Sequence, residues 1–183
     1  ALVEKPSDQM LVVVSDYLSG YTGIEDALDE YHQDVMVQGW WSTTIFVSTT
    51  NTLAQFYCPA PQDLKDVIHD NFFVNGYTGI LFVGSEPGIP TAYANDTVGN
   101  GKAGASDLFY ADMGPTSWTD VNTDGIYDMR DSSGTPLIPF ADLVPELFVG
   151  RLSAKHVSTT PTLDVIANQG DLILEYGHRI NES

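Results

Sequence analysis

The sequence is poor in cysteine and in basic side chains. Cys58 is the single cysteine among 183 residues, which excludes a disulfide within the chain and a zinc site built from cysteines. Seven Lys and Arg residues stand against 25 Asp and Glu residues, giving a formal net charge of −18 at pH 7. Nucleic acids and anionic membranes bind through positive patches, so we expect neither as a partner, whereas cations are expected.

Long apolar runs are also missing. No segment reaches the roughly 18 consecutive apolar residues that cross a bilayer, and no basic-then-apolar leader is present. Because the chain begins with Ala1 rather than Met, we expect a mature or excised piece of a longer protein. The high acidity is typical of secreted or salt-adapted proteins that are kept soluble by self-repulsion, and we expect a secreted or cell-surface location.

Enough apolar sequence is present for one substantial core, since 43% of the residues are hydrophobic. Residues 10–15, 41–49 and 79–84 are short runs rich in β-branched or aromatic side chains, which are typical of buried strands. Residues 24–35 and 61–72 carry apolar side chains at helical spacing, and each of these segments lies between two of the strand-like runs.

This alternation predicts an α/β fold. Helical crossovers between strands imply a mainly parallel sheet, so we expect a three-layer Rossmann-like sandwich of about four to five strands. A last strand at 147–149 and a helix at 162–178 extend the pattern. We expect residues 1–183 to form a single α/β domain with a long loop insertion at 85–145, and loops of that length are often functional.

The sharpest motif of the insertion is the acidic segment 120–131. Oxygen-bearing side chains fall at loop positions 1, 3, 5, 9 and 12, Gly125 stands at position 6, and position 7 offers a main-chain carbonyl. Hard oxygen ligands favour Ca²⁺ over softer metals. The predicted calcium ligands are Asp120, Asn122, Asp124, Ile126, Asp128 and Asp131.

Position 12 departs from the pattern of an EF-hand. Asp131 is shorter than the bidentate Glu usual there, and no helical pattern flanks the segment. The segment is similar instead to the Asp-terminated calcium loops of dockerin-type repeats, in a single copy. A solvated acidic turn that binds no metal is the alternative.

Two further motifs carry little chemistry. Residues 99–104 match G-x-G-x-x-G, but no strand directly precedes them and no helical stripe follows, so a surface loop is expected rather than a phosphate site. No base stands beside Cys58 in the sequence, and we expect a buried, inert thiol. The four histidines are too scattered for a metal site.

Four segments, taken in order, resemble the first half of a gingipain-type cysteine peptidase domain. They are residues 80–84 (ILFVG), 89–91 (IPT), 106–112 (SDLFYAD) and 145–152 (PELFVGRL). The resemblance extends over residues 10–180 and implies a caspase-like fold, in which this chain is the first of two side-by-side α/β subdomains.

The resemblance also implies where the chemistry lies. In that family the catalytic His and the nucleophilic Cys follow in the second subdomain, and neither Cys58 nor His178 matches those motifs. No catalytic residue is therefore expected in this chain, and the second subdomain is its expected partner. For Asp107 the family implies a place near the active-site cleft, orienting the His or lining the specificity pocket; a structural acid that binds backbone N–H groups is the alternative.

Together these observations favour the N-terminal part of a secreted, gingipain-like cysteine endopeptidase that lacks the Cys–His pair and binds Ca²⁺ in its acidic loop. The intact enzyme would act on peptides or proteins. The main alternative is a non-enzymatic, calcium-dependent binding or adhesion module with the same fold, and a nucleotide-binding α/β domain is a third reading. Downstream sequence with Gly-His and then a Cys after a strand would favour the peptidase.

Overall fold

The structure is a computed structural model of the chain, and it describes residues 8–20, 23–84, 86, 88–95, 98, 103–114, 118–130, 132–137 and 144–152. The described residues divide into two compact units. The main unit runs up to Pro90 and resumes at Gly150, and the inserted unit spans Thr91–Val149.

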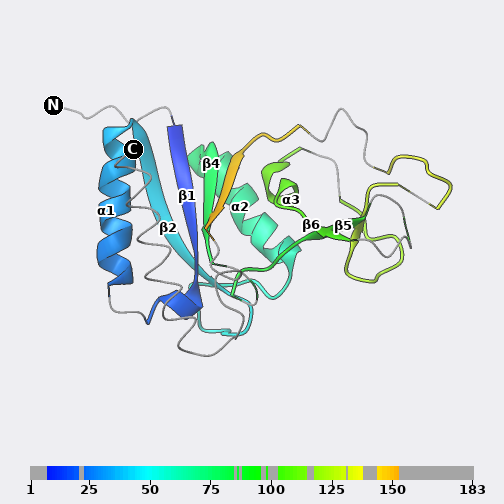
Figure 1. The fold of residues 1–183 in the computed structure, drawn as a ribbon, viewed down its shortest axis with the longest axis horizontal. Helices are drawn as coiled ribbons and strands as arrows, with labels where there is room; N and C mark the ends of the chain where they lie inside the picture. Colours follow the sequence, from blue (N-terminus) through cyan, green and yellow to red (C-terminus); the bar gives the residue numbers. More distant parts are fainter. Residues whose placement is uncertain are drawn as a thin grey trace. The chain divides into compact units, whose positions relative to one another are not determined.

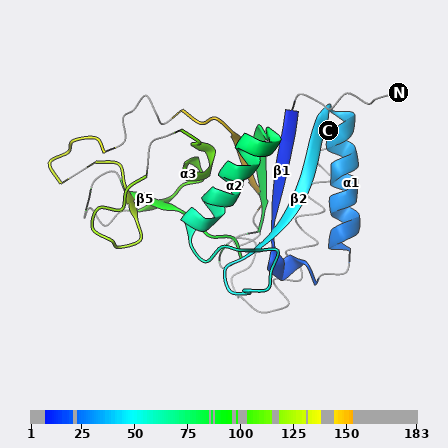
Figure 2. The same cartoon turned by 180° about the vertical axis from the view of Figure 1, so that it is seen from behind.

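The main unit is built on a five-stranded sheet with strand order β3-β2-β1-β4-β8. The strands are β1 (Asp8–Ser15), β2 (Trp40–Ser48), β3 (Phe56–Tyr57), β4 (Gly79–Val83) and β8 (Phe148–Leu152). β1 pairs in parallel with both β2 and β4, and β2 pairs in parallel with β3. The helices α1 (Ile24–Val37) and α2 (Pro61–Asn75) cover opposite faces (Figures 1 and 2). The expected three-layer α/β sandwich is confirmed.

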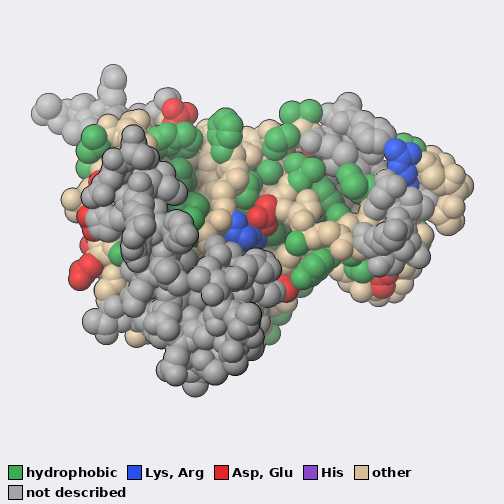
Figure 3. Space-filling model, in the orientation of Figure 1, with side chains coloured by type: hydrophobic (Ala, Val, Ile, Leu, Met, Phe, Trp, Pro, Cys, Tyr) green, Lys and Arg blue, Asp and Glu red, His purple; other side chains and the backbone are tan. Residues whose placement is uncertain are grey.

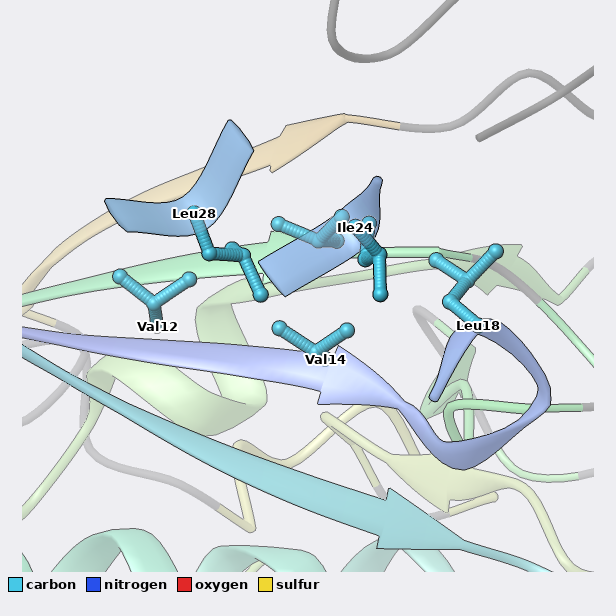
Figure 4. Packing of buried hydrophobic residues seen from close by; sticks show 6 residues of the cluster. Val12, Val14, Leu18, Ile24 and Leu28 are labelled. Carbon is cyan, nitrogen blue, oxygen red and sulfur yellow. The ribbon is translucent and has the colours of Figure 1, made fainter. Parts of the chain in front are cut away.

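The core on the α1 face explains why these segments fold as they do. β1 is buried along most of its length, as a run of Val and Leu without alternation requires for a central strand. Its residues Val12 and Val14 pack with Ile24 and Leu28 of α1 (Figure 4). The helical spacing that predicted α1 is therefore the spacing that brings its apolar stripe onto the sheet.

The opposite stripe of α1 carries the acids. Glu25, Asp26, Asp29 and Glu30 are all exposed, and the first two lie in the first turn, where the helix dipole favours negative charge. Figure 3 shows acidic side chains on the side of the main unit where α1 lies. Among the described helices, none is long and apolar enough to cross a membrane.

The inserted unit contains more regular structure than its sequence suggests. Its sheet has the order β6-β5-β7, from β5 (Tyr93–Asn95), β6 (Gly104–Ala105) and β7 (Tyr127–Asp128), and a short helix α3 (Leu108–Ala111) follows β6. Strands of two or three residues are too short to leave a periodic pattern, so the sequence indicated only a loop. The single-domain assignment stays a prediction, and the helix expected at 162–178 lies outside the described residues.

Candidate functional site

The acidic loop closes on the carboxylate of Asp120. The backbone N–H of Asp124 donates to Asp120 Oδ1 at 3.1 Å, and the N–H of Gly125 donates to Asp120 Oδ2 at 2.8 Å. Thr123 and Gly125 have φ values of 58° and 84°, which wind the chain tightly between these contacts. The first predicted ligand therefore also holds the shape of the loop.

Asp128 marks the other end of the loop and is fully buried, with 0% of its surface exposed. Its Oδ2 accepts the N–H of Val121 at 3.1 Å, and its own N–H donates to the carbonyl of Thr119 at 2.8 Å. Its Oδ1 is buried and has no hydrogen-bond partner. A buried carboxylate oxygen left unpaired is costly, and a cation or an ordered water is the usual explanation for one.

The remaining predicted ligands lie between these two acids. Asp124 Oδ1 accepts the N–H of Ile126 at 2.9 Å, and Asp124 Oδ2 accepts the side-chain N–H of Asn122 at 2.8 Å. Asp131 lies outside the described residues. Within the described part of the chain, no three His, Cys, Asp or Glu side chains already surround a common metal position. Calcium binding by this loop stays a prediction.

An aromatic cluster, formed by Phe109, Tyr110, Trp118 and Tyr127, anchors the loop. Phe109 stacks on Tyr127 with ring centroids 4.5 Å apart and meets Trp118 edge-on at 5.5 Å. Trp118 precedes the loop and Tyr127 lies near its C-terminal end. The buried ring of Phe109 contacts both side chains and therefore holds both ends of the loop.

The structure draws attention to Asp112 rather than to Asp107. Asp107 is half-buried before α3, and its backbone carbonyl accepts the N–H of Tyr110 at 3.0 Å. Asp112 is fully buried, and it accepts the indole N–H of Trp118 at 2.7 Å and the N–H of Gly114 at 3.1 Å. Sequence reasoning missed Asp112, because a hydrogen bond between a carboxylate and an indole N–H requires no fixed spacing of the two residues in the sequence. A cleft role for Asp107 stays a prediction.

The carboxyl ends of β1 and β4, in the main unit, are a second position where a ligand site could be expected. Strand order reverses between these two strands, and open α/β sheets bind ligands at that point. Here the space is closely filled: a Cβ on Gly84 would lie 2.9 Å from Cβ of Ser15, and one on Gly88 would lie 2.8 Å from the same atom. Arg151 Nη1 donates to the carbonyl of Gly84 at 3.4 Å.

The described thiol and imidazoles are held in structural contacts. Cys58 is 1% exposed, and burial, reinforced by the charge of Asp63, raises the pKa of its thiol to about 11. The ring nitrogens of His32 contact the hydroxyls of Ser42 and Thr44, and burial lowers the pKa of this imidazole. His69 packs on the ring of Phe73 with centroids 4.5 Å apart. His156 and His178 lie outside the described residues.

Cys58 is therefore expected to resist alkylation in the folded protein. Raising the thiol pKa from 9.0 to about 11 lowers the thiolate fraction at neutral pH roughly 100-fold, and only the thiolate is a nucleophile. Mass spectrometry after timed exposure to iodoacetamide measures the rate, with protein unfolded in guanidinium as the control. Equal rates in the folded and unfolded protein would contradict the buried environment.

Comparison with known proteins supplies a family. The family model of peptidase family C25 matches residues 4–163. A solved structure described as "Structure of Protease" aligns with 93% of this chain at 16% sequence identity and a TM-score of 0.48. The chain spans 28% of the length of that structure's chain. No curated protein matches the chain.

Proposed function

Since this chain belongs to peptidase family C25, the gingipain family, we propose that it is the N-terminal part of a gingipain-like cysteine endopeptidase, secreted or at the cell surface. The observation that carries this proposal is the family match over residues 4–163, which covers all of the inserted unit and most of the main unit. The high pKa and burial of Cys58 support a nucleophile elsewhere in the protein.

In the proposed enzyme the downstream subdomain supplies the reacting pair. A Cys thiolate, formed by proton transfer to a His, attacks the peptide carbonyl carbon; the amine leaves with the proton from the His, and water then hydrolyses the thioester. This chain contributes the sheet beside that subdomain, and Asp107 contributes an orienting or specificity-determining carboxylate. We assign it no catalytic residue of its own.

The acidic loop is proposed to hold Ca²⁺. Asp120, Asn122, Asp124, Asp128 and Asp131 would bind through side-chain oxygens, and Ile126 through its carbonyl. The unpartnered, buried Oδ1 of Asp128 supports this donor set, and all of the donors are the hard oxygens that calcium prefers. The hydrogen bond from Asn122 to Asp124 competes with the metal, so binding requires that amide to turn. The bound ion would hold the loop in a fixed conformation.

Peptidase assays on two forms of the protein test the proposal. The full-length protein is expected to hydrolyse peptide substrates, to lose that activity on treatment with iodoacetamide, and to retain it when Cys58→Ala is introduced. Residues 1–183 alone are expected to show no hydrolysis above background. Activity of the short chain that Cys58→Ala abolishes would overturn the assignment. A full-length protein that binds a surface only with calcium and cleaves nothing would favour the adhesion module.

A further inference from the structure

Buried polar atoms without a hydrogen-bond partner are confined, among the described residues, to two side chains. They are both atoms of the Asn95 amide group, Oδ1 and Nδ2, and Oδ1 of Asp128. Asn95 is 1% exposed and Asp128 is 0% exposed. Native proteins pair nearly all such groups, so two exceptions in one small unit point to a ligand that both of them share.

The two side chains are neighbours across the small sheet. β5 and β7 pair in parallel, with Asn95 opposite Asp128 and Ala94 opposite Tyr127, and the N–H of Met129 donates to the carbonyl of Asn95 at 2.9 Å. Successive side chains of a strand point to opposite faces, and residues in register share a face. Tyr127 joins the aromatic cluster on one face, so Asp128 and Asn95 share the other.

That shared face is the face of the acidic loop, because Asp128 Oδ2 accepts the N–H of Val121 within the loop. Asn95 therefore places a neutral amide oxygen beside the carboxylate oxygen that a loop cation would use. Neither atom of the amide group has a partner, so the group can turn its oxygen toward a cation without breaking a hydrogen bond.

The coordination chemistry of calcium favours an additional oxygen ligand from outside the loop. The ion takes about six to eight oxygen ligands, and the loop ends in Asp131 rather than in a longer Glu that supplies two oxygens. We propose that Asn95 Oδ1 is a calcium ligand that the site takes from outside the acidic loop. This inference rests on the calcium binding proposed above, and it makes the ion a link between β5 and residues 120–131.

Calcium titration of the chelator-treated full chain by calorimetry tests the role of Asn95. The site is identified as the binding that Asp124→Ala removes. Asn95→Leu is expected to weaken that site at least tenfold, because even groups that only support a metal ligand commonly contribute about 10–100-fold to affinity. Asn71→Leu is the control: it makes the same change on α2, where the side-chain amide of Asn71 donates a hydrogen bond to the carbonyl of Val67. This variant is expected to bind calcium as the wild type does.

Thermal melting in chelator separates a ligand from a structural amide. Without calcium, Asn95→Leu is expected to melt no lower than the wild type, because it removes buried polar atoms that have no partner. A lower melting temperature together with unchanged affinity would overturn the proposal. If Asn95→Leu fails to fold, Asn95→Asp decides: tighter calcium binding supports a ligand, and equal or weaker binding overturns it.

The two proposals fail in different ways. If the wild type has an Asp124-dependent site whose affinity Asn95→Leu leaves unchanged, the role of Asn95 is wrong and the loop remains a calcium site. If calorimetry finds no binding that depends on Asp124, the calcium proposal is wrong and the role of Asn95 falls with it.

Discussion

Substituting alanine for Gly84 is expected to lower the free energy of unfolding by about 2–6 kcal/mol. Two separate costs add. Gly84 has φ of 125°, a conformation that other residues adopt only with strain of about 1–3 kcal/mol. The new Cβ would also lie 2.9 Å from Cβ of Ser15, which is 3% exposed, and overpacking of this kind costs about 1–3 kcal/mol. Urea denaturation measures the change.

A comparison with Gly88 separates the two costs. Gly88→Ala places its Cβ 2.8 Å from Ser15 Cβ, against Ser15 Oγ, and 2.9 Å from Cδ2 of Tyr17, so we expect only the steric cost, about 1–3 kcal/mol. In a Ser15→Gly background, Gly88→Ala should lose the part of its cost that comes from Ser15 and keep the part that comes from Tyr17, whereas Gly84→Ala should keep its backbone strain. Gly20→Ala is the control, because nothing lies within 4 Å of its Cβ. If Gly84→Ala is as stable as Gly20→Ala, the close contact at the strand ends is wrong.

Calcium is expected to raise the melting temperature of the chain by roughly 5–10 °C when its concentration reaches 100 times the dissociation constant. A ligand that binds only the folded state stabilises it by about 2.7 kcal/mol under that condition. The folded loop supplies the pinned Asp120 and the buried Asp128, and an unfolded chain supplies no such arrangement. Melting curves in chelator and in millimolar Ca²⁺ give the measurement.

Variants of the loop show whether that stabilisation is local. Asp124→Ala is expected to abolish the calcium-dependent increase, and Asp128→Asn to reduce it, because each removes a carboxylate from the donor set. Asp26→Ala removes an acid from α1 that is exposed, as Asp124 is, and this variant should respond to calcium as the wild type does. An equal response in Asp124→Ala and wild type would mean that the loop is only an acidic turn.

The main unit was largely predictable from the sequence because its elements are long and strongly patterned. The run at 10–15 became β1, and the apolar stripe from Ile24 became α1, which ends at Val37. Pro61 begins α2, as expected from its missing N–H in a first helical turn. The two-residue strand β3 was not predicted, because two residues are too few to show a strand pattern and the strand is defined by its pairing with β2.

The structure of the inserted unit was hardly predictable, because it depends on contacts between residues that are distant in the sequence. Trp118, Phe109 and Tyr127 read separately as isolated aromatics in a polar stretch, and only their packing makes a core. The acidic loop was recognisable because its ligands follow a fixed spacing. Asn95 was not, because its position opposite Asp128 comes from strand pairing and leaves no mark in the local sequence.

The burial of Asn95 has a consequence for producing the protein. Asn95-Asp96-Thr97 is an acceptor sequence for N-linked glycans in hosts that modify secreted proteins. A side chain that is 1% exposed cannot carry an oligosaccharide in the folded unit. A glycan attached there during synthesis would keep the Asn95 side chain from reaching its buried position. Bacterial expression, or Thr97→Ala in a glycosylating host, avoids that competition between modification and folding.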